Sequence, residues 1–239
     1  NAAMPGLRTS FAILLLVLAL APASAFARDA LPIAPAQLDA GYWIAKLSKA
    51  DRVVLDTNAI AARNAALPKL EPTWHDLAAL PASLDRDAVR ARIENVSAPP
   101  TRASYAGDGH ALDAEQLASL RDSLALDAIP RETPVRFALV LHRAPLRTFP
   151  TLQRVFSKPG DSDIDRFQES ALFPGTPVAV LHASRDGRWR FVVAPNYAAW
   201  IRADALAEGS RDEVLGYAGK QPRLVVTGSG VRTVFDPSR

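Results

Sequence analysis

The stretch VAVLHASRDGRWRFVVA, residues 178–194, decides the fold of the second half of the chain. It consists of two apolar runs, at 178–183 and 189–194, separated by a short polar segment with Asp186-Gly187 near its centre. Glycine supplies the positive φ that tight turns require, and short apolar runs bounded by turn residues are typical of strands. The stretch therefore predicts two antiparallel strands joined as a hairpin.

Further strands are expected on either side of this hairpin. The runs at 135–141 and 197–201 predict two short strands. Residues 146–173 are polar and lack a regular pattern, which predicts a large loop. Two more runs between 224 and 235 flank a Gly-Ser-Gly turn and predict a second hairpin.

The first half of the chain is expected to be helical. Apolar residues recur at helical spacing in four segments, near 38–47, 53–67, 84–94 and 113–124. In the third segment Arg90, Arg92 and Glu94 are expected to face solvent, and in the fourth Asp113 and Gln116 form a capping box. Helices come first and short strands follow without βαβ alternation. The predicted fold class is therefore α+β, with a helical region followed by a small antiparallel β-barrel.

The N-terminus has the pattern of an export signal. Arg8 precedes an apolar run at 11–21, and Ala25-Phe26-Ala27 fits a cleavage site. The run is about half of the ~20 residues that a membrane-spanning helix needs. A retained anchor is the alternative, but length and flanks favour a cleaved signal at 4–27. A periplasmic or secreted protein without a stable membrane anchor is expected.

The composition excludes several classes of function. The 239 residues carry a net charge of +3, with basic residues scattered among acidic ones, so no nucleic-acid-binding surface is expected. The chain has no cysteine, which excludes a thiol nucleophile, a Cys-based metal site and disulfides.

No metal, cofactor or catalytic residue is predicted from the motifs. None of the four histidines lies three or four residues from another, so no local metal-ligand pair exists. The acidic residues between 161 and 169 lack the spacing of a calcium loop and predict a solvated loop. Gly228-Ser229-Gly230 lies between two predicted strands, where a turn is expected and a nucleophile elbow is not.

Residues 135–207 resemble a bacterial SH3 domain. The resemblance rests on five stretches: LRTFPT at 146–151, DRFQES at 165–170, GTPV at 175–178, SRDGRW at 184–189 and YAAWI at 197–201. Together they are similar to the first SH3-like module of NlpC-type peptidases of the p-sixty superfamily, which cut γ-D-glutamyl–diamino-acid bonds in peptidoglycan stems. Ala199 stands where that module usually has glycine before the closing tryptophan.

The resemblance extends over most of the chain. Residues 28–130, with Tyr42-Trp43 and the Ile60 and Asn64 pair, are similar to the stabilising N-terminal domain of the same enzymes. The SH3-like domain would then occupy 131–210, and 221–239 resemble the start of a second, truncated SH3-like domain. The expected partners are peptidoglycan stem peptides and a C-terminal catalytic domain that is missing from this sequence.

What the resemblance implies is a recognition role without catalysis. In that family the catalytic Cys and His belong to the missing domain, so no catalytic residue is assigned here, and the chain is expected to be a non-catalytic, stabilising and peptidoglycan-recognition fragment. Asp165, Tyr197 and Trp200 are the candidate substrate-binding residues. The aromatic pair could equally fill the core.

Two other functions remain open at this point. One is a complete, non-enzymatic wall-peptide-binding or scaffold protein that uses the SH3-like module. The other is a hydrolase with a cysteine-free site, for which the sequence shows no cluster of histidines and acids.

Overall fold

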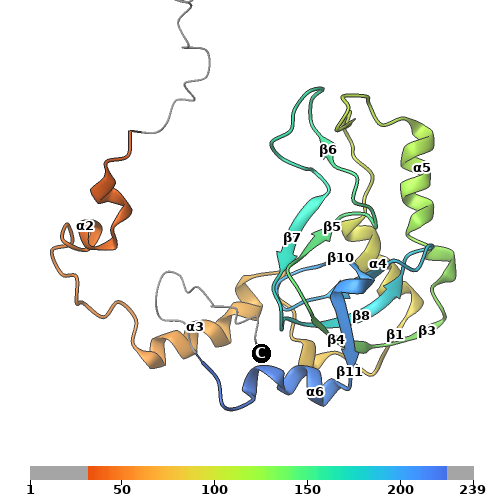
Figure 1. Cartoon of the computed structure of the whole chain (residues 1–239). Coiled ribbons are helices and arrows are strands. Elements are labelled where there is room, and N and C mark those ends of the chain that lie inside the picture. The colour runs from red at the N-terminus through yellow and green to blue at the C-terminus, as the bar shows by residue number, and fades with distance from the viewer. Residues whose placement is uncertain (1–31, 225–239) are drawn as a thin grey trace, which may run out of the picture. The chain divides into compact units, whose positions relative to one another are not determined.

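The computed structural model describes residues 32–224 (Figure 1). The chain divides into two compact units, residues 1–60 and 61–239. The predicted signal peptide at 4–27 lies outside the described residues, as does nearly all of the hairpin expected between 224 and 235. Of the predicted module at 221–239, only the first four residues are described, and they contain no strand.

The first unit contains less helix than the sequence predicts. Its described part has a 3-10 turn, η1 (Pro35–Leu38), and a short helix, α2 (Ala40–Ile44), which Asp39 caps by accepting a hydrogen bond from the Gly41 amide. Leu38, Ile44 and Leu47 are exposed, so the expected apolar face is not buried. Apolar spacing alone predicted too long a helix here, because Asp39 ends one short element and begins another.

Helix α3 (Thr57–Leu70) differs from the prediction at both ends. It begins after Asp56, whose carboxylate accepts a hydrogen bond from the Ala59 amide, so Val53 and Val54 precede it. At its other end the helix runs past the predicted limit at 67, and Pro68 lies inside its last turn. Proline lacks the N–H that would bond to the Asn64 carbonyl, but the bond after it is still made, because the Glu71 amide donates to the Leu67 carbonyl.

The helices of the second unit confirm the capping signals. Helix α4 (Arg86–Val96) is capped by Asp85, and α5 (Ala114–Ser123) begins with the predicted capping box of Asp113 and Gln116. A further helix that the sequence did not predict, α6 (Arg211–Gly216), follows the last strand and lies beside β4 (Figure 1). Ser210 and Glu213 form its capping box.

The centre of the second unit is a seven-stranded antiparallel sheet in the order β11-β4-β8-β9-β10-β5-β7. Its strands are β4 (Arg136–Val140), β5 (Ala144–Arg147), β7 (Gln168–Leu172), β8 (Pro177–Ala183), β9 (Trp189–Val193), β10 (Ala198–Arg202) and β11 (Leu206–Gly209). The predicted hairpin is confirmed as β8 and β9, with Gly187 at φ 70° in its turn. The sheet has more strands than the small barrel expected from the sequence.

Two short strand pairs connect the first half of the chain to the second. Strand β1 (Ser83–Asp85) pairs with β3 (Glu132–Pro134), and β2 (Tyr105–Ala106) pairs with β6 (Val155–Phe156). The mixed helix and antiparallel sheet content agrees with the predicted class. The large loop expected at 146–173 is wrong in part, because it contains β6, β7 and the end of β5.

The sheet is buried on both faces. One apolar cluster combines helix residues such as Val89, Ile93 and Leu124 with Phe191 and Trp200 of the strands. The other contains mostly small residues of the opposite strand faces, including Val180, Val192 and Ala199. Because both faces are covered, Val192 is buried together with Phe191 and Val193 on either side of it, where a half-buried strand would alternate.

A buried histidine joins the sheet to the end of α5. His182, on β8, is 8% exposed, and its Nε2 donates to the carbonyl oxygens of Leu124 at 3.0 Å and Ala125 at 3.1 Å. Burial lowers the pKa of His182 below its ordinary value. The neutral ring is therefore the form that fits the folded state.

Stability should fall as the pH drops below about 6.5, the ordinary histidine value. Because the folded pKa of His182 is lowered, the unfolded chain binds more protons in this window, and the loss levels off below the folded pKa. Urea unfolding between about pH 8 and pH 5.5 checks this expectation. His182→Gln should flatten the slope, and equal slopes for the two proteins would contradict the assignment.

Candidate functional site

The three candidate residues from the sequence do not share one pocket. Asp165 lies in the loop before β7, Tyr197 lies just before β10, and Trp200 lies within β10. Asp165 and Tyr197 each line a pocket, while Trp200 lines neither.

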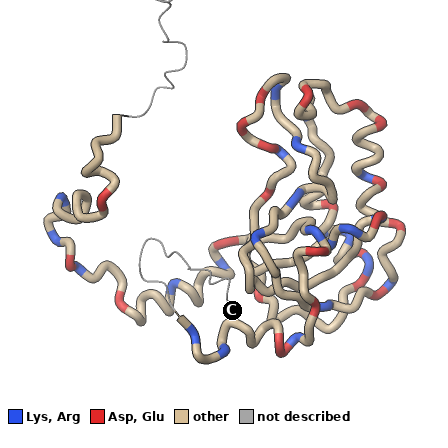
Figure 2. The backbone as a smooth tube through the Cα atoms, in the orientation of Figure 1, with Lys and Arg blue, Asp and Glu red and all other residues tan. Residues whose placement is uncertain are grey.

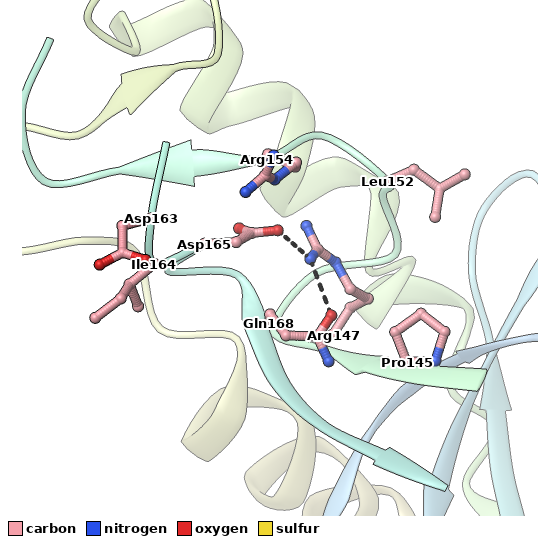
Figure 3. Close-up of a pocket in the computed structure, with 8 residues that line it drawn as sticks. All are labelled: Pro145, Arg147, Leu152, Arg154, Asp163, Ile164, Asp165 and Gln168. Atoms are coloured by element: carbon pink, nitrogen blue, oxygen red, sulfur yellow. Dashed lines mark hydrogen bonds and ion pairs between the residues drawn. The ribbon is translucent and has the colours of Figure 1, made fainter. Parts of the chain in front are cut away.

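The Asp165 pocket has a volume of about 560 Å³ and is built on a buried ion pair (Figure 3). Arg147 Nη1 lies 2.5 Å from Asp165 Oδ2, with the two side chains 4% and 11% exposed. The other carboxylate oxygen, Oδ1, accepts hydrogen bonds from the amides of Val155 and Phe167. The Asp165 carboxylate is therefore fully used within the protein.

Arg147 likewise uses its hydrogen-bond donors within the protein. Besides Asp165, its guanidinium donates to the carbonyl oxygens of Thr151 and Gln153. One buried cation thus fixes both arms of the loop between β5 and β7. The geometry assigns Arg147 and Asp165 to the shape of this loop.

Trp200 is buried in the core, with 0% of its surface exposed. Its indole nitrogen donates to Ser97 Oγ at 3.0 Å, and Ser97 Oγ in turn donates to the Thr148 carbonyl at 2.7 Å. These bonds tie β10 to the end of α4 and to the loop after β5. Of the two alternatives for this residue, the structure shows core packing, so the ring has no surface to offer a ligand.

The Tyr197 pocket has a volume of about 400 Å³. It is lined by Pro72, Thr73, His75, Arg92, Asn95, Val96, Glu169, Tyr197 and Ala198. The Tyr197 hydroxyl donates to Glu169 Oε2 at 2.5 Å, and Thr148 Oγ1 donates to Glu169 Oε1 at 2.6 Å. The bond to Glu169 raises the pKa of Tyr197 to about 12, so the hydroxyl stays protonated and the carboxylate stays in place.

The opposite wall of this pocket comes from the helical half of the chain. Arg92 and Asn95 lie three residues apart on α4, which places them on one helix face. His75 is held beside them because its amide donates to the Pro195 carbonyl at 2.8 Å, next to the turn between β9 and β10. Burial, and then the nearby Arg92 charge, lower the pKa of His75. The pocket thus joins residues more than 90 positions apart.

Two charged residues of this pocket had been assigned to solvent from the sequence. Arg92 was expected to face solvent, but it is partly buried and its Nη1 donates to the Ala88 carbonyl at 2.8 Å. Glu169 was placed in a solvated acidic loop, but it lies on β7 and accepts two hydroxyl hydrogen bonds. The available signal for Glu169 was its place in the DRFQES stretch.

Charged residues of both signs are interspersed along the described backbone (Figure 2). Among residues 32–224, no group of three or more His, Asp or Glu side chains could hold a metal ion. No helix in the same range is long and apolar enough to cross a bilayer.

A comparison with protein families identifies the domain that contributes Glu169 and Tyr197 to the Tyr197 pocket. Residues 154–202 match the SH3 domain of the SH3b1 type. An SH3b domain is thus present, as the sequence predicted. The SH3b1-type domain includes Glu169 and Tyr197, whereas Arg92 and Asn95 precede it, so the pocket lies where the domain meets α4.

The fold is similar to that of an NlpC/P60 endopeptidase from Photobacterium damselae subsp. piscicida. The TM-score is 0.52 at 19% sequence identity, over 71% of this chain and 40% of that chain. At this identity the likeness is one of fold, and the chain spans less than half the length of that enzyme. A comparison with curated protein sequences gives no match.

Proposed function

We propose that this chain is the non-catalytic, stabilising and peptidoglycan-recognition portion of an exported γ-D-glutamyl–diamino-acid endopeptidase. The observation that carries the proposal is the SH3b1-type match at 154–202, set within a fold similar to an NlpC/P60 endopeptidase. The sequence contains no cysteine, so a partner domain would have to supply the thiol nucleophile.

The Tyr197 pocket is the proposed contact with the stem peptide. It is concave, and six of its nine lining residues are polar or charged. Two hydroxyls hold its carboxylate in one orientation, and polar groups in fixed positions are what orient a ligand in a binding site. Stem peptides offer amide, ammonium and carboxylate groups, which the side chains of this pocket can pair with. The Asp165 pocket is a weaker candidate, because its central charges already satisfy each other.

Replacing Glu169 by glutamine should weaken stem-peptide binding roughly 10- to 100-fold, the usual range for losing a hydrogen bond to a charged group. The measurement is calorimetric titration of the chain with a synthetic stem tripeptide that contains the γ-D-glutamyl–diaminopimelate bond. Chromatography of the same mixture should return the peptide uncleaved.

Asp163→Asn is the matched control for this titration. Asp163 is an exposed acid that lines the other pocket, so its variant loses one negative charge without touching the Tyr197 pocket. Its affinity should equal that of the unmodified chain. Equal binding by the Glu169 variant, or no binding by the unmodified chain, would overturn the proposal.

A further inference from the structure

The Tyr197 pocket contains a cation and an anion that have no ionic partner among residues 32–224. Arg92 and Glu169 both line it, yet among the described residues neither forms a salt bridge with any other side chain. Glu169 is held by hydroxyls, and Arg92 by one carbonyl of its own helix. Charges that are partly withdrawn from water gain stability when a ligand supplies the opposite charge.

The guanidinium of Arg92 has donors to spare. It carries five N–H groups in a planar fork, and within residues 32–224 only Nη1 has a recorded acceptor. A planar fork of this kind matches a carboxylate, which can accept two parallel hydrogen bonds. Asn95 lies on the same wall of the pocket and adds an amide that can donate to the same ligand group.

We propose that Arg92, assisted by Asn95, binds a free carboxylate of the stem peptide while Glu169 and Tyr197 bind a hydrogen-bond donor of the same ligand. The ligand class is therefore a dipolar peptide that carries an unmodified carboxylate. This inference rests on the proposed function and deepens it. It also assigns a recognition role to α4, which lies outside the SH3b1-type match.

The test is a double-mutant cycle between Arg92 and the ligand carboxylates. The chain and its Arg92→Gln variant are each titrated with the stem tripeptide and with two amidated forms, one at the glutamyl α-carboxylate and one at the C-terminus. Arg92→Gln should weaken binding of the free acid roughly 10- to 100-fold. One of the two amidated peptides should bind the unmodified chain with a similar loss of affinity relative to the free acid. The Arg92→Gln variant should bind that amidated peptide and the free acid with equal affinity.

Arg90→Gln is the matched control, because Arg90 lies on the same helix but pairs with Glu94 in an exposed i,i+4 bridge. Its affinity should be unchanged. The inference alone would be overturned if the chain bound the peptide tightly and Arg92→Gln did not change the affinity. It would also be overturned if, for both amidated peptides, the loss from amidation and the loss from Arg92→Gln were additive. A chain that binds none of the peptides would overturn the proposed function and this inference with it.

Discussion

Replacing Asp165 by alanine should lower the free energy of unfolding by about 3–5 kcal/mol, because it leaves Arg147 buried without its partner. The substitution also removes the acceptor of the Val155 and Phe167 amides, so two more buried polar groups lose a hydrogen bond. Chemical denaturation of the chain, followed by tryptophan fluorescence and circular dichroism, measures this loss.

The control for this substitution is an ion pair of similar length on the surface. Arg136 and Glu208 lie 2.7 Å apart, but both side chains are nearly half exposed. Glu208→Ala should therefore cost less than about 1 kcal/mol. Similar losses for the two variants would show that the Arg147–Asp165 pair is not the organising contact of the loop.

Trp200→Ala should be comparably damaging, with a loss of about 3–5 kcal/mol in the free energy of unfolding. The ring is fully buried and packs edge-on against Phe191, with 5.6 Å between ring centroids. Its removal would leave a cavity between β9, β10 and the helices, and would take away the donor to Ser97. Thermal and denaturant unfolding both report this loss.

Two further variants serve as controls for Trp200→Ala. Trp200→Phe keeps most of the packing and should cost less than the alanine variant. Phe173→Ala removes an aromatic ring that is 63% exposed, so it should change stability by no more than about 0.5 kcal/mol. If Trp200→Ala behaved like the Phe173 variant, the ring could not be part of the core.

The elements that the sequence predicted well are those specified by local chemistry. The β8–β9 hairpin follows from Asp186-Gly187 between two apolar runs, and α5 follows from the Asp113 and Gln116 capping box. Each signal lies within a few residues of the structure it specifies. Such patterns can be interpreted without knowing what packs against them.

The elements that the sequence did not predict depend on distant partners. Strand β7 begins with Gln168-Glu169-Ser170, which looks like a polar loop, because Glu169 is satisfied by Thr148 and Tyr197. Trp200 could have been core or surface until α4 was known to place Ser97 beside it.

The candidate site likewise combines a residue that the sequence identified with residues that only tertiary contacts bring together. Tyr197 was a candidate binding residue from the sequence, with core packing as the equal alternative, and in the structure it lines a pocket. Arg92 was not identified, because a lone arginine on a helix is usually solvated and only the tertiary fold places it opposite Glu169. The Tyr197 pocket is thus assembled by contacts that no local pattern encodes.

Locating the bound peptide is the decisive test of the proposal that this chain recognises wall stem peptides through the Tyr197 pocket. An amide chemical-shift titration of the isotope-labelled chain with the stem tripeptide provides that location. Binding in the Tyr197 pocket should give saturable shifts centred on Asn95, Glu169 and Ala198. Shifts centred on the Asp165 pocket, or none at saturating peptide, would contradict it.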